Sequence, residues 1–557
     1  MDAITTSWVK PPHQIGGLDH LGVQAPCIQI YGDLLPGITN VTDRARYYSF
    51  YPWLFAQFEK EGWREKEQVT QMLRRADCLL SLIGLRHEQL DPHHSELHRA
   101  AMVGNEVLSR AILSLNHEDS TIHLSQYARL DENSDRYFKN TYGALGQYYF
   151  GTLRGLGLFE GDSVGNARVL KETGVKLAEL VGLSVQGELF IGCLVKDEIS
   201  SQDLDGLAGF CGCQLQTSTA EVDALVGVML SGWQALYADG APSDDELRAS
   251  KVRAHSLAYM CQLADIAAEQ KMPFDVFLFR AMTYTRSGPL MASLELPVNL
   301  LDVELNWQVY QRNELLSIAL QGLFYAQLRA CELANNLFDS TKALSEWFWL
   351  ESIGTEVIGD NKTSNCQKFI ESIADSLPEF ANWQDEKHEI QCMERIRRLT
   401  NKKGTSIGDV KLILGDALTV LSTIIVRPEN SMGYGDHVFP DNYLDYYPVN
   451  LGSVMEGWEA EISGLPVVGG LAKFIQINCL DAHLRVAMRK LHQQGSNTFR
   501  FELSERGLVV KDIPGAANTT PRFRQAVRIL EDLGLLKSVD GLMKTTPSGR
   551  RFIEAAL

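Results

Sequence analysis

Two short stretches carry side chains of the kind that bind metal ions. The stretch DPHHSELH contains His93, His94 and His98. On a helix that starts near Asp91, His94 and His98 share one face at the i, i+4 spacing that metal ligands use. A catalytic zinc helix has the pattern His-Glu-x-x-His, whereas this stretch is His-Ser-Glu-Leu-His and places the acid wrongly. The pattern therefore favours a capped helix start with exposed histidines.

Cys211 and Cys213 lie close together in the stretch GFCGCQL. They could bind one metal ion together, but no second cysteine pair has a suitable spacing. The ten cysteines include no C-x-x-C pair, which argues against structural zinc and against a disulfide framework. We interpret both residues as small buried hydrophobic side chains. The sequence thus predicts no metal centre and no cofactor.

A loop at residues 427–450, RPENSMGYGDHVFPDNYLDYYPVN, gathers acids, a histidine and tyrosines. An active-site loop would have this composition, and so would an ordered interface loop rich in tyrosine. The chain contains no phosphate-binding P-loop, no strand-linked G-x-G-x-x-G, no G-x-S-x-G elbow and no kinase signature. We therefore predict no catalytic residue. An enzyme with a site near residues 433–445 (Gly433, Gly435, Asp436, His437, Asp441 and Asp445) is a third hypothesis.

Basic residues are concentrated near the C-terminus, although the whole chain is acidic. Residues 496–557 hold ten Lys or Arg against seven Asp or Glu, a net charge of +3. Because the whole chain has a net charge of −18, the remaining residues carry −21. A dedicated nucleic-acid protein usually has a basic footprint. Most of this surface would repel free duplex, so any DNA contact must be local or delivered by a partner.

The segment 519–557 predicts the elements that carry these cations. Thr520 and Pro521 suit the N-cap and the first position of a helix. An apolar stripe follows at helical spacing, formed by Phe523, Val527, Ile529, Leu530 and Leu533. Gly534 ends this helix.

A tight hairpin follows, because Asp540-Gly541 is a strong turn signal between the strand residues on either side. Pro547, Ser548 and Gly549 then begin a final basic helix. Helix, hairpin and closing helix in this order resemble the winged-helix (winged helix-turn-helix) fold of bacterial DNA-binding regulators. The resemblance covers the last 39 of the 557 residues and concerns the fold more than the function.

The same signature occurs a second time inside residues 115–181. The stretch LRGLGLF (153–159) matches LEDLGLL (530–536) in its Leu-x-x-Leu-Gly-Leu spacing. Turn residues follow, then a return strand at 168–170 and a closing helix at 175–181. This segment has a net charge of −2, with seven basic and nine acidic residues, which favours a protein-binding or structural module.

The winged-helix resemblance implies a binding surface. The helix after Pro521 resembles the recognition helix, whose outward face enters the major groove of DNA. Arg and Gln side chains suit guanine and adenine edges and phosphates, but a solvated face that docks a protein would have the same composition. We expect protein partners, with DNA as a further partner of the C-terminal domain. The predicted DNA- or partner-binding residues are Arg522, Arg524, Gln525, Arg528, Lys537, Lys544, Arg550 and Arg551.

The composition is that of a globular protein, with 45% hydrophobic and 22% charged residues over 557 positions. Nearly every periodic segment between residues 175 and 426 has the helical period. The predicted fold class is mainly α, a multi-domain helical body with small β-wings of winged-helix domains. The predicted domains are a loop-rich and helical region (1–95), a helical, winged-helix-like domain (96–182), a helical core (183–427), an ordered loop and connector (428–480) and a winged-helix domain (481–557).

The same observations limit location and function. No apolar run approaches the length of a membrane helix, and residues 1–14 lack the layout of a signal peptide, so we expect a cytoplasmic protein without membrane contacts. An acidic helical body with winged helices resembles, in architecture only, kleisin-type subunits that bridge chromosome-organising ATPases, and accessory subunits of antiphage (antiviral defence) systems.

Two hypotheses lead. In the first, the chain is a non-enzymatic scaffold or adaptor of a bacterial multicomponent assembly that binds proteins, such as an ATPase or nuclease encoded nearby, and DNA through its winged helices. In the second, it is a DNA-binding transcriptional regulator with a large helical sensing or oligomerisation domain. Self-association is compatible with both.

Overall fold

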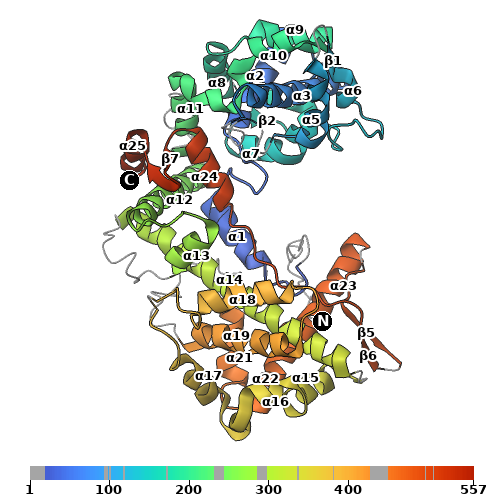
Figure 1. Ribbon diagram of the computed structural model, residues 1–557, viewed down its shortest axis with the longest axis vertical. Coiled ribbons are helices and arrows are strands. Elements are labelled where there is room, and N and C mark those ends of the chain that lie inside the picture. Colours follow the sequence, from blue (N-terminus) through green and yellow to red (C-terminus); the bar gives the residue numbers. More distant parts are fainter. Residues whose placement is uncertain are drawn as a thin grey trace, which may run out of the picture. The chain divides into compact units, whose positions relative to one another are not determined.

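The chain folds into two compact units, each built from segments that are distant in the sequence (Figure 1). The first unit comprises residues 1–31, 277–295 and 304–520, and the second comprises 32–276, 296–303 and 521–557. The predicted domain at 481–557 therefore contributes to both units. The computed structural model describes residues 19–92, 98, 102–116, 120–170, 173–230, 244–284, 298–334, 338–380, 382–426, 449–495, 497–505 and 507–557.

Of the residues that the structure describes, 68% are helical and 5% lie in strands, which confirms the predicted mainly α fold class. Among the described residues the strands form four two-stranded antiparallel sheets, in which β1 pairs with β4, β2 with β3, β5 with β6 and β7 with β8. No single helix among the described residues is long and apolar enough to cross a membrane. One bent pair of helices, α8 (Gly174–Gly182) with α9 (Gly187–Lys196), meets that criterion by length and composition alone.

The elements of the second unit are mostly helical. In chain order they are α2 (Arg46–Lys60), α3 (Lys66–Leu90), α5 (Asn105–Ile112), η2 (Leu113–Asn116), β1 (Ile122–His123), α6 (Leu124–Ala128), the π-helix η3 (Leu145–Tyr149), α7 (Phe150–Gly155), β2 (Phe159–Glu160), η4 (Val164–Asn166), β3 (Arg168–Val169), α8 (Gly174–Gly182), α9 (Gly187–Lys196), β4 (Glu198–Ile199), α10 (Ser201–Gly206), η5 (Ala208–Phe210), η6 (Gly212–Thr217), α11 (Thr219–Leu230), α12 (Asp244–Glu269), α24 (Phe523–Asp532), β7 (Leu536–Val539), β8 (Leu542–Thr545) and α25 (Pro547–Ala556).

The first unit holds the remaining elements. They are α15 (Thr341–Leu350), α16 (Ile353–Ile358), η7 (Gly359–Thr363), α17 (Cys366–Ala374), α18 (Glu389–Thr400), α19 (Ile407–Val426), α21 (Leu451–Glu461), α22 (Val467–Ile475), the π-helix η9 (Gln476–Asp481), α23 (Ala482–Gln494), β5 (Phe501–Ser504) and β6 (Gly507–Val510). Three further helices contain residues of both units: α1 (Ala25–Leu34), α13 (Val276–Tyr284) and α14 (Val298–Ala334).

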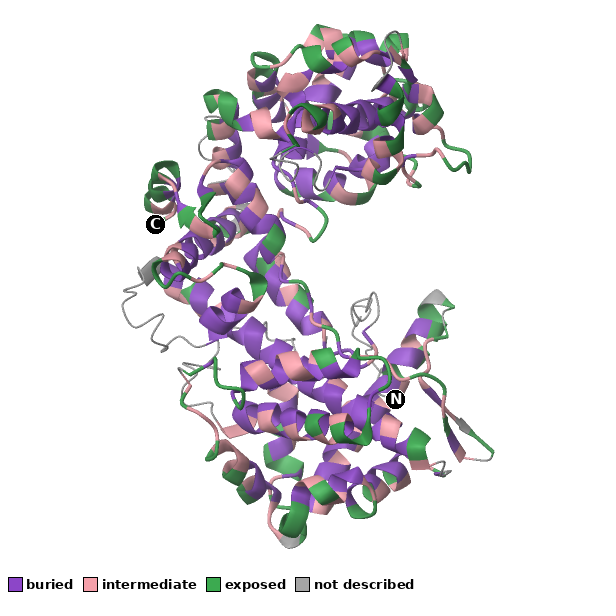
Figure 2. Cartoon of the chain, viewed as in Figure 1, coloured by how far each residue is buried: buried purple, intermediate pink, exposed green. Residues whose placement is uncertain are grey.

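Aromatic side chains form the centre of the second unit. Phe50 and Trp53 on α2 pack against Phe190 of α9 and Phe210 of η5, with ring centroids 4.5 to 6.3 Å apart. All four side chains are buried, as are most residues of α2 and the middle of α3 (Figure 2). Rings in such contact add stabilisation beyond their buried area. Phe210 of η5 thus anchors the start of the segment that continues through Cys211 into η6.

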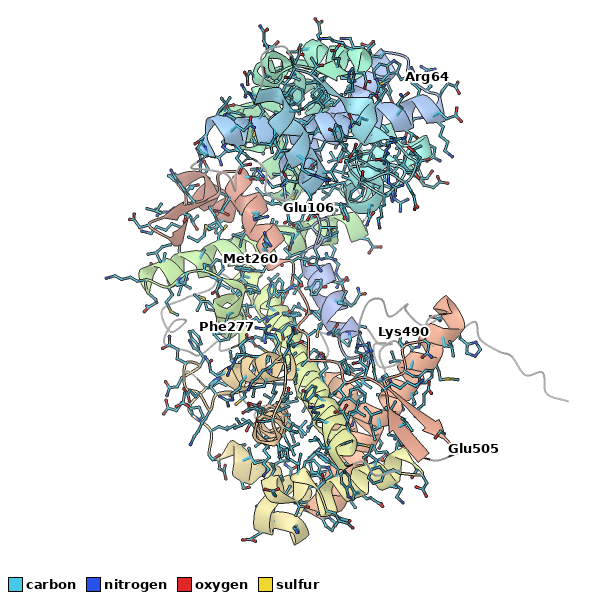
Figure 3. All side chains as sticks on the ribbon, turned by 45° about the vertical axis from the view of Figure 1, so that its right-hand side comes forward. Arg64, Glu106, Met260, Phe277, Lys490 and Glu505 are labelled. Carbon is cyan, nitrogen blue, oxygen red and sulfur yellow. The ribbon has the colours of Figure 1, made fainter. Side chains whose placement is uncertain are left out.

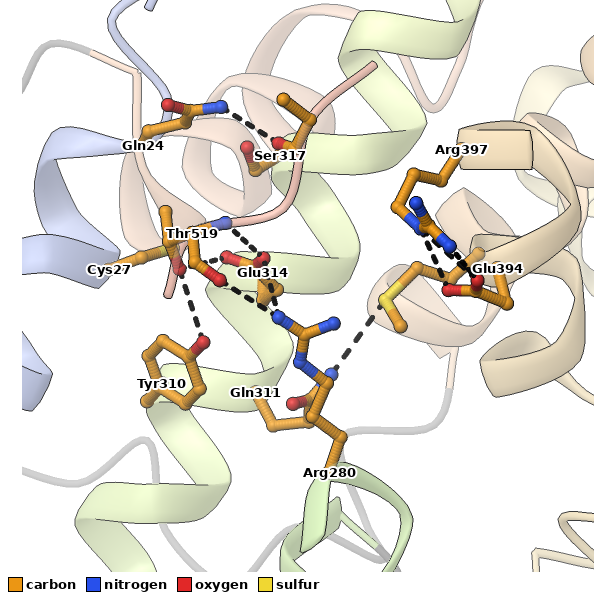
Figure 4. Close-up of polar contacts among 12 residues, drawn as sticks. Gln24, Cys27, Arg280, Tyr310, Gln311, Glu314, Ser317, Glu394, Arg397 and Thr519 are labelled. Atoms are coloured by element: carbon orange, nitrogen blue, oxygen red, sulfur yellow. Dashed lines mark hydrogen bonds and ion pairs between the residues drawn. The ribbon is translucent and has the colours of Figure 1, made fainter. Parts of the chain in front are cut away.

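A buried polar network fixes the segment before the C-terminal elements within the first unit. Glu314 on α14 accepts hydrogen bonds from the backbone N–H and the hydroxyl of Thr519, both at 2.7 Å. Arg280 donates to the carbonyl oxygen of Thr519 at 2.8 Å, and its Nη2 lies 3.7 Å from Glu314 (Figure 4). Burial raises the pKa of Glu314, and the Arg280 cation and the Thr519 donors oppose that rise. A buried charge needs such partners to be tolerated.

The N-terminal segment of the first unit is held by α23. The ammonium group of Lys490, which is labelled in Figure 3, donates a hydrogen bond to the carbonyl oxygen of Asp19 at 2.7 Å. On the same helix, His483 has its Nδ1 3.0 Å from the carbonyl oxygen of His20 and accepts the backbone N–H of Arg500 at Nε2, at 2.9 Å. An acceptor at one nitrogen and a donor at the other fix a neutral imidazole with its proton on Nδ1.

The C-terminal module, defined as residues 523–556 with α24, β7, β8 and α25, has the predicted order of helix, hairpin and helix. Asp540 and Gly541 form the turn and both have positive φ, 53° and 76°. The predicted helix start was wrong, because α24 begins at Phe523 after Arg522, whose φ is 55°. Thr520 and Pro521 precede the helix. The winged-helix assignment itself stays a prediction.

The internal repeat has the same local hydrogen bonds as the C-terminal module. Leu158 donates its N–H to Leu153 and accepts from Leu170, at 2.9 and 3.1 Å. In the C-terminal module Leu535 does the same with Leu530 and Thr546, at 2.8 and 3.0 Å.

Each closing helix carries a glycine where a backbone carbonyl oxygen comes very close. A Cβ atom added at Gly174 would lie 2.4 Å from the carbonyl oxygen of Leu158, and one at Gly549 would lie 2.2 Å from that of Leu535. Only glycine permits either approach.

Candidate metal centre and candidate binding surface

Four metal-ligating side chains converge within the second unit. The ligand atoms of His87, His98, Cys211 and Cys213 all lie within 4.8 Å of one another. Nδ1 of His98 is 3.5 Å from Sγ of Cys211, and Nδ1 of His87 is 3.4 Å from Sγ of Cys213. The centroids of the two imidazole rings are 4.6 Å apart. His98 and Cys211 are buried, and the other two are half-buried.

The two histidines lie on either side of the C-terminal end of α3. His87 lies in the last turn of α3, which ends before Asp91. His98 lies close to the same helix, because a Cβ added at Gly84 would be only 2.7 Å from the carbonyl oxygen of His98. A glycine on α3 therefore permits the approach that brings His98 to His87.

The two cysteines flank Gly212, the first residue of η6. A Cβ at Gly212 would lie 2.3 Å from Nη2 of Arg44, so a larger residue there would displace the Arg44 guanidinium. The buried Arg44 forms an ion pair with Asp532 of α24 at 2.9 Å. The cysteine turn is thus held between the aromatic core and the C-terminal module.

Hydrogen bonding makes the two thiols unequal. The Cys211 thiol donates to Cys213, which lowers the pKa of Cys213 and raises that of Cys211. Gln214 donates to Cys213 as well, at 3.4 Å, and lowers its pKa further. A carboxylate oxygen of Asp91 lies 3.4 Å from Nε2 of His98, the nitrogen that faces away from the cysteines.

The structure corrects our interpretation of these residues. His98 was expected to be an exposed histidine, yet 1% of it is exposed. Cys213 was expected to be a buried hydrophobic residue, yet it is half-buried beside an imidazole. His93, His94 and the loop at 433–445 lie outside the described residues. Sequence reasoning did not consider His87, because its partners lie far from it in the sequence.

Three of the predicted binding residues are engaged within the second unit. Gln525 donates to Asp43 at 2.8 Å and to the carbonyl oxygen of Asn40 at 3.0 Å, and 5% of it is exposed. Arg528 pairs with Asp43 at 3.1 Å. Arg522 donates to the carbonyl oxygens of Leu35 and Gly32, at 2.9 and 3.3 Å. The polar face of α24 is therefore turned toward residues 32–43 of the same unit.

The other five predicted residues are exposed and constitute the basic surface of the C-terminal module. Within the described part of the chain none of them forms an ion pair with a carboxylate. Lys537 and Lys544 are direct cross-strand partners on the hairpin, and like charges in this arrangement destabilise a sheet. The basic surface consists of Arg524, Lys537, Lys544, Arg550 and Arg551.

Comparison of the chain with models of protein families finds no match. Searches of curated proteins and of solved structures find no significant match either.

Proposed function

We propose that this chain is a non-enzymatic scaffold that binds an acidic surface of a partner protein through the basic surface of its C-terminal module. The observation that carries the proposal is the placement of cations on this module. The cations on the inward face of α24 are matched by residues of the same unit, such as Asp43. The five cations of the basic surface have no such match among the residues that the structure describes, so we infer that their charge is available to a partner.

The contacts of α24 favour a protein over DNA. In a winged-helix DNA reader, the outward face of this helix supplies contacts to base edges. Here Gln525 and Arg528, the side chains suited to that role, hold Asp43 instead. The basic surface alone could contact phosphates, which position a protein on DNA but carry no sequence information. A net charge of −18 further opposes association with free duplex.

A recess next to the basic surface supports protein recognition. A cavity of about 510 Å³ lies between α11 and the C-terminal module, and its lining includes Val222, Leu533, Phe552 and Arg551. The lining mixes apolar side chains with polar ones, and Asp223 and Arg551 are both among them, so the recess has room for a protein side chain next to the basic surface. The proposed partner class comes from the architectural resemblance alone, a subunit of a multicomponent assembly such as an ATPase or nuclease.

The proposal is tested by charge reversal on the hairpin. A partner is first identified by pull-down and mass spectrometry and then purified. Lys537→Glu with Lys544→Glu should lower the affinity of the chain for this partner by at least about tenfold, as measured by calorimetry. The matched control is Lys60→Glu with Lys251→Glu, which reverses two exposed lysines on helices of the same unit. The control should bind as the unaltered chain does.

A salt-titrated DNA-binding assay on the same preparation provides the opposing outcome. If the purified chain alone binds one DNA sequence selectively at physiological salt, the scaffold proposal is wrong and the regulator hypothesis replaces it. Equal partner affinity of the hairpin variant and the control would remove the basic surface from the interface.

A further inference from the structure

We propose that His87, His98, Cys211 and Cys213 bind one structural Zn²⁺ ion. Zinc prefers four nitrogen and sulfur ligands in a tetrahedron, with Zn–S near ~2.3 Å and Zn–N near ~2.0 Å. These bond lengths place a sulfur and a nitrogen ligand about 3.5 Å apart. The two sulfur–nitrogen separations in the cluster are 3.5 and 3.4 Å, which match that geometry.

The convergence of all four groups distinguishes a metal site from two separate hydrogen bonds. A thiol–imidazole hydrogen bond would account for either pair alone. It would not bring both pairs within 4.8 Å of one another, since two neutral pairs gain little from that approach. Two thiolates and two imidazoles around one point are the donor set that favours zinc among the divalent metals of the cell.

The surroundings of the cluster also suit a metal ion. The carboxylate of Asp91 lies 3.4 Å from Nε2 of His98, whereas Nδ1 of the same ring faces the cysteines. A carboxylate behind the non-ligating nitrogen orients a metal-bound histidine and increases its basicity. Four protein ligands complete the tetrahedron and leave no position for substrate, which makes the site structural.

The zinc ion would hold the loop on which the C-terminal module rests. η6, which contains Cys213, packs against α24. Gln216 of η6 donates to the carbonyl oxygen of Glu531 at 2.8 Å, and Arg44 behind the cysteine turn pairs with Asp532. Loss of the metal should therefore loosen the C-terminal module as well as the ligand loop.

The first measurement is the metal content of the full chain, purified without a metal-affinity step, by inductively coupled plasma mass spectrometry. We expect one zinc ion per chain. After removal of the metal with a chelator, addition of Co²⁺ should produce the strong visible absorption and the sulfur-to-metal charge-transfer band of a tetrahedral thiolate site. Limited proteolysis should cut the C-terminal module faster in the chelated chain, and Zn²⁺ should reverse this change.

Two ligand variants and one control complete the experiment. Cys213→Ser and His87→Ala change half-buried ligands and should each lower the bound zinc at least about fivefold. Cys193→Ser changes a buried cysteine of the same unit outside the cluster and should retain the zinc. If the ligand variants do not fold, chelation and reloading of the unaltered chain decide the question alone.

Three results would overturn the proposal. A folded, unaltered chain that holds no zinc and gives no cobalt spectrum has no such site. Iron or copper at full occupancy would assign the cluster to another metal. Unchanged zinc content in both ligand variants would place the ion elsewhere.

Discussion

Nε of Arg44 donates to a carboxylate oxygen of Asp532 at 2.9 Å, and both side chains are almost completely buried. The same oxygen accepts the backbone N–H of Ala45 at 2.9 Å. Asp532→Ala should lower the free energy of unfolding by about 3–5 kcal/mol, because it leaves a buried guanidinium without its counter-charge. Denaturant unfolding followed by circular dichroism measures this loss.

The matched variant removes both charges together. Arg44→Met with Asp532→Leu should cost clearly less than the single change, since no unpaired charge remains. A single variant as stable as the unaltered chain would show that the ion pair contributes nothing to the fold.

Replacement of the glycine in either copy of the repeat should lower the stability of the protein by a similar amount. Gly174→Ala and Gly549→Ala should each destabilise the protein by about 1–3 kcal/mol, because the new Cβ would overlap a backbone oxygen that has little freedom to move. Gly192→Ala is the control, since nothing lies within 4 Å of a Cβ at that exposed helix position. It should stabilise by up to about 1 kcal/mol. Thermal unfolding of the three variants measures the contrast, and a harmless Gly549→Ala would contradict it.

The neutral imidazole of His483 predicts a loss of stability in acid. Burial lowers its pKa from 6.5 to about 4. Between these values the unfolded chain binds a proton that the folded chain does not, so this stabilisation is present above pH 6.5 and is lost as the pH falls through 4. The difference is about 3 kcal/mol. Denaturant unfolding between pH 7 and pH 4 should show a smaller acid loss for His483→Gln than for the unaltered chain, and equal losses would refute the assignment.

Asp77 predicts the opposite pH dependence. Burial raises its pKa from 3.8 to about 6, although Ala144, Tyr137 and Tyr51 all donate hydrogen bonds to it. The folded state keeps a proton that the unfolded state loses, so this contribution is present below pH 3.8 and is lost as the pH rises through 6.

The contribution of Asp77 protonation to the free energy of unfolding should again be about 3 kcal/mol. Unfolding measured at pH 4.5 and at pH 7.5 should show that the stability of Asp77→Asn relative to the unaltered chain increases with pH. A constant difference between the two chains would exclude titration of Asp77 in this range.

Two neighbouring arginines of the C-terminal module should respond differently to the same substitution. Arg528→Glu places a carboxylate against Asp43 and should lower the free energy of unfolding by about 1–3 kcal/mol. Arg524→Glu changes an exposed side chain and should alter stability by less than about 0.5 kcal/mol. Equal effects in thermal unfolding would show that the contact between Arg528 and Asp43 does not contribute to stability.

Local signals in the sequence predicted the C-terminal module well. Turn chemistry at Asp540-Gly541 and apolar periodicity from Phe523 act over a few residues, so they can be read without knowledge of the rest of the chain. The start of α24 was wrong by two residues because Thr519 is bound by Glu314, a contact from 205 positions away. Such a contact overrides the local preference of Thr520 for a helix cap.

The candidate metal centre could not be predicted from spacing. His87 and His98 are eleven residues apart in the sequence, and the cysteines follow more than a hundred residues later. Gln525 and Arg528 were likewise predicted to contact DNA or a partner because the helix after Pro521 resembles a recognition helix with an outward polar face. That inference holds only where no charged partner such as Asp43 packs on the polar face. Both cases depend on tertiary contacts that sequence periodicity does not encode.

The discontinuous make-up of the two units has a consequence for biosynthesis. The second unit takes its last segment from residues 521–557, which leave the ribosome only after the whole first unit has been made. Until then Arg44 and Asp43 lack the partners that bury them. Pairing of such distant segments is slow and exposes apolar surface during synthesis. The nascent chain should therefore depend on chaperones until translation reaches α24.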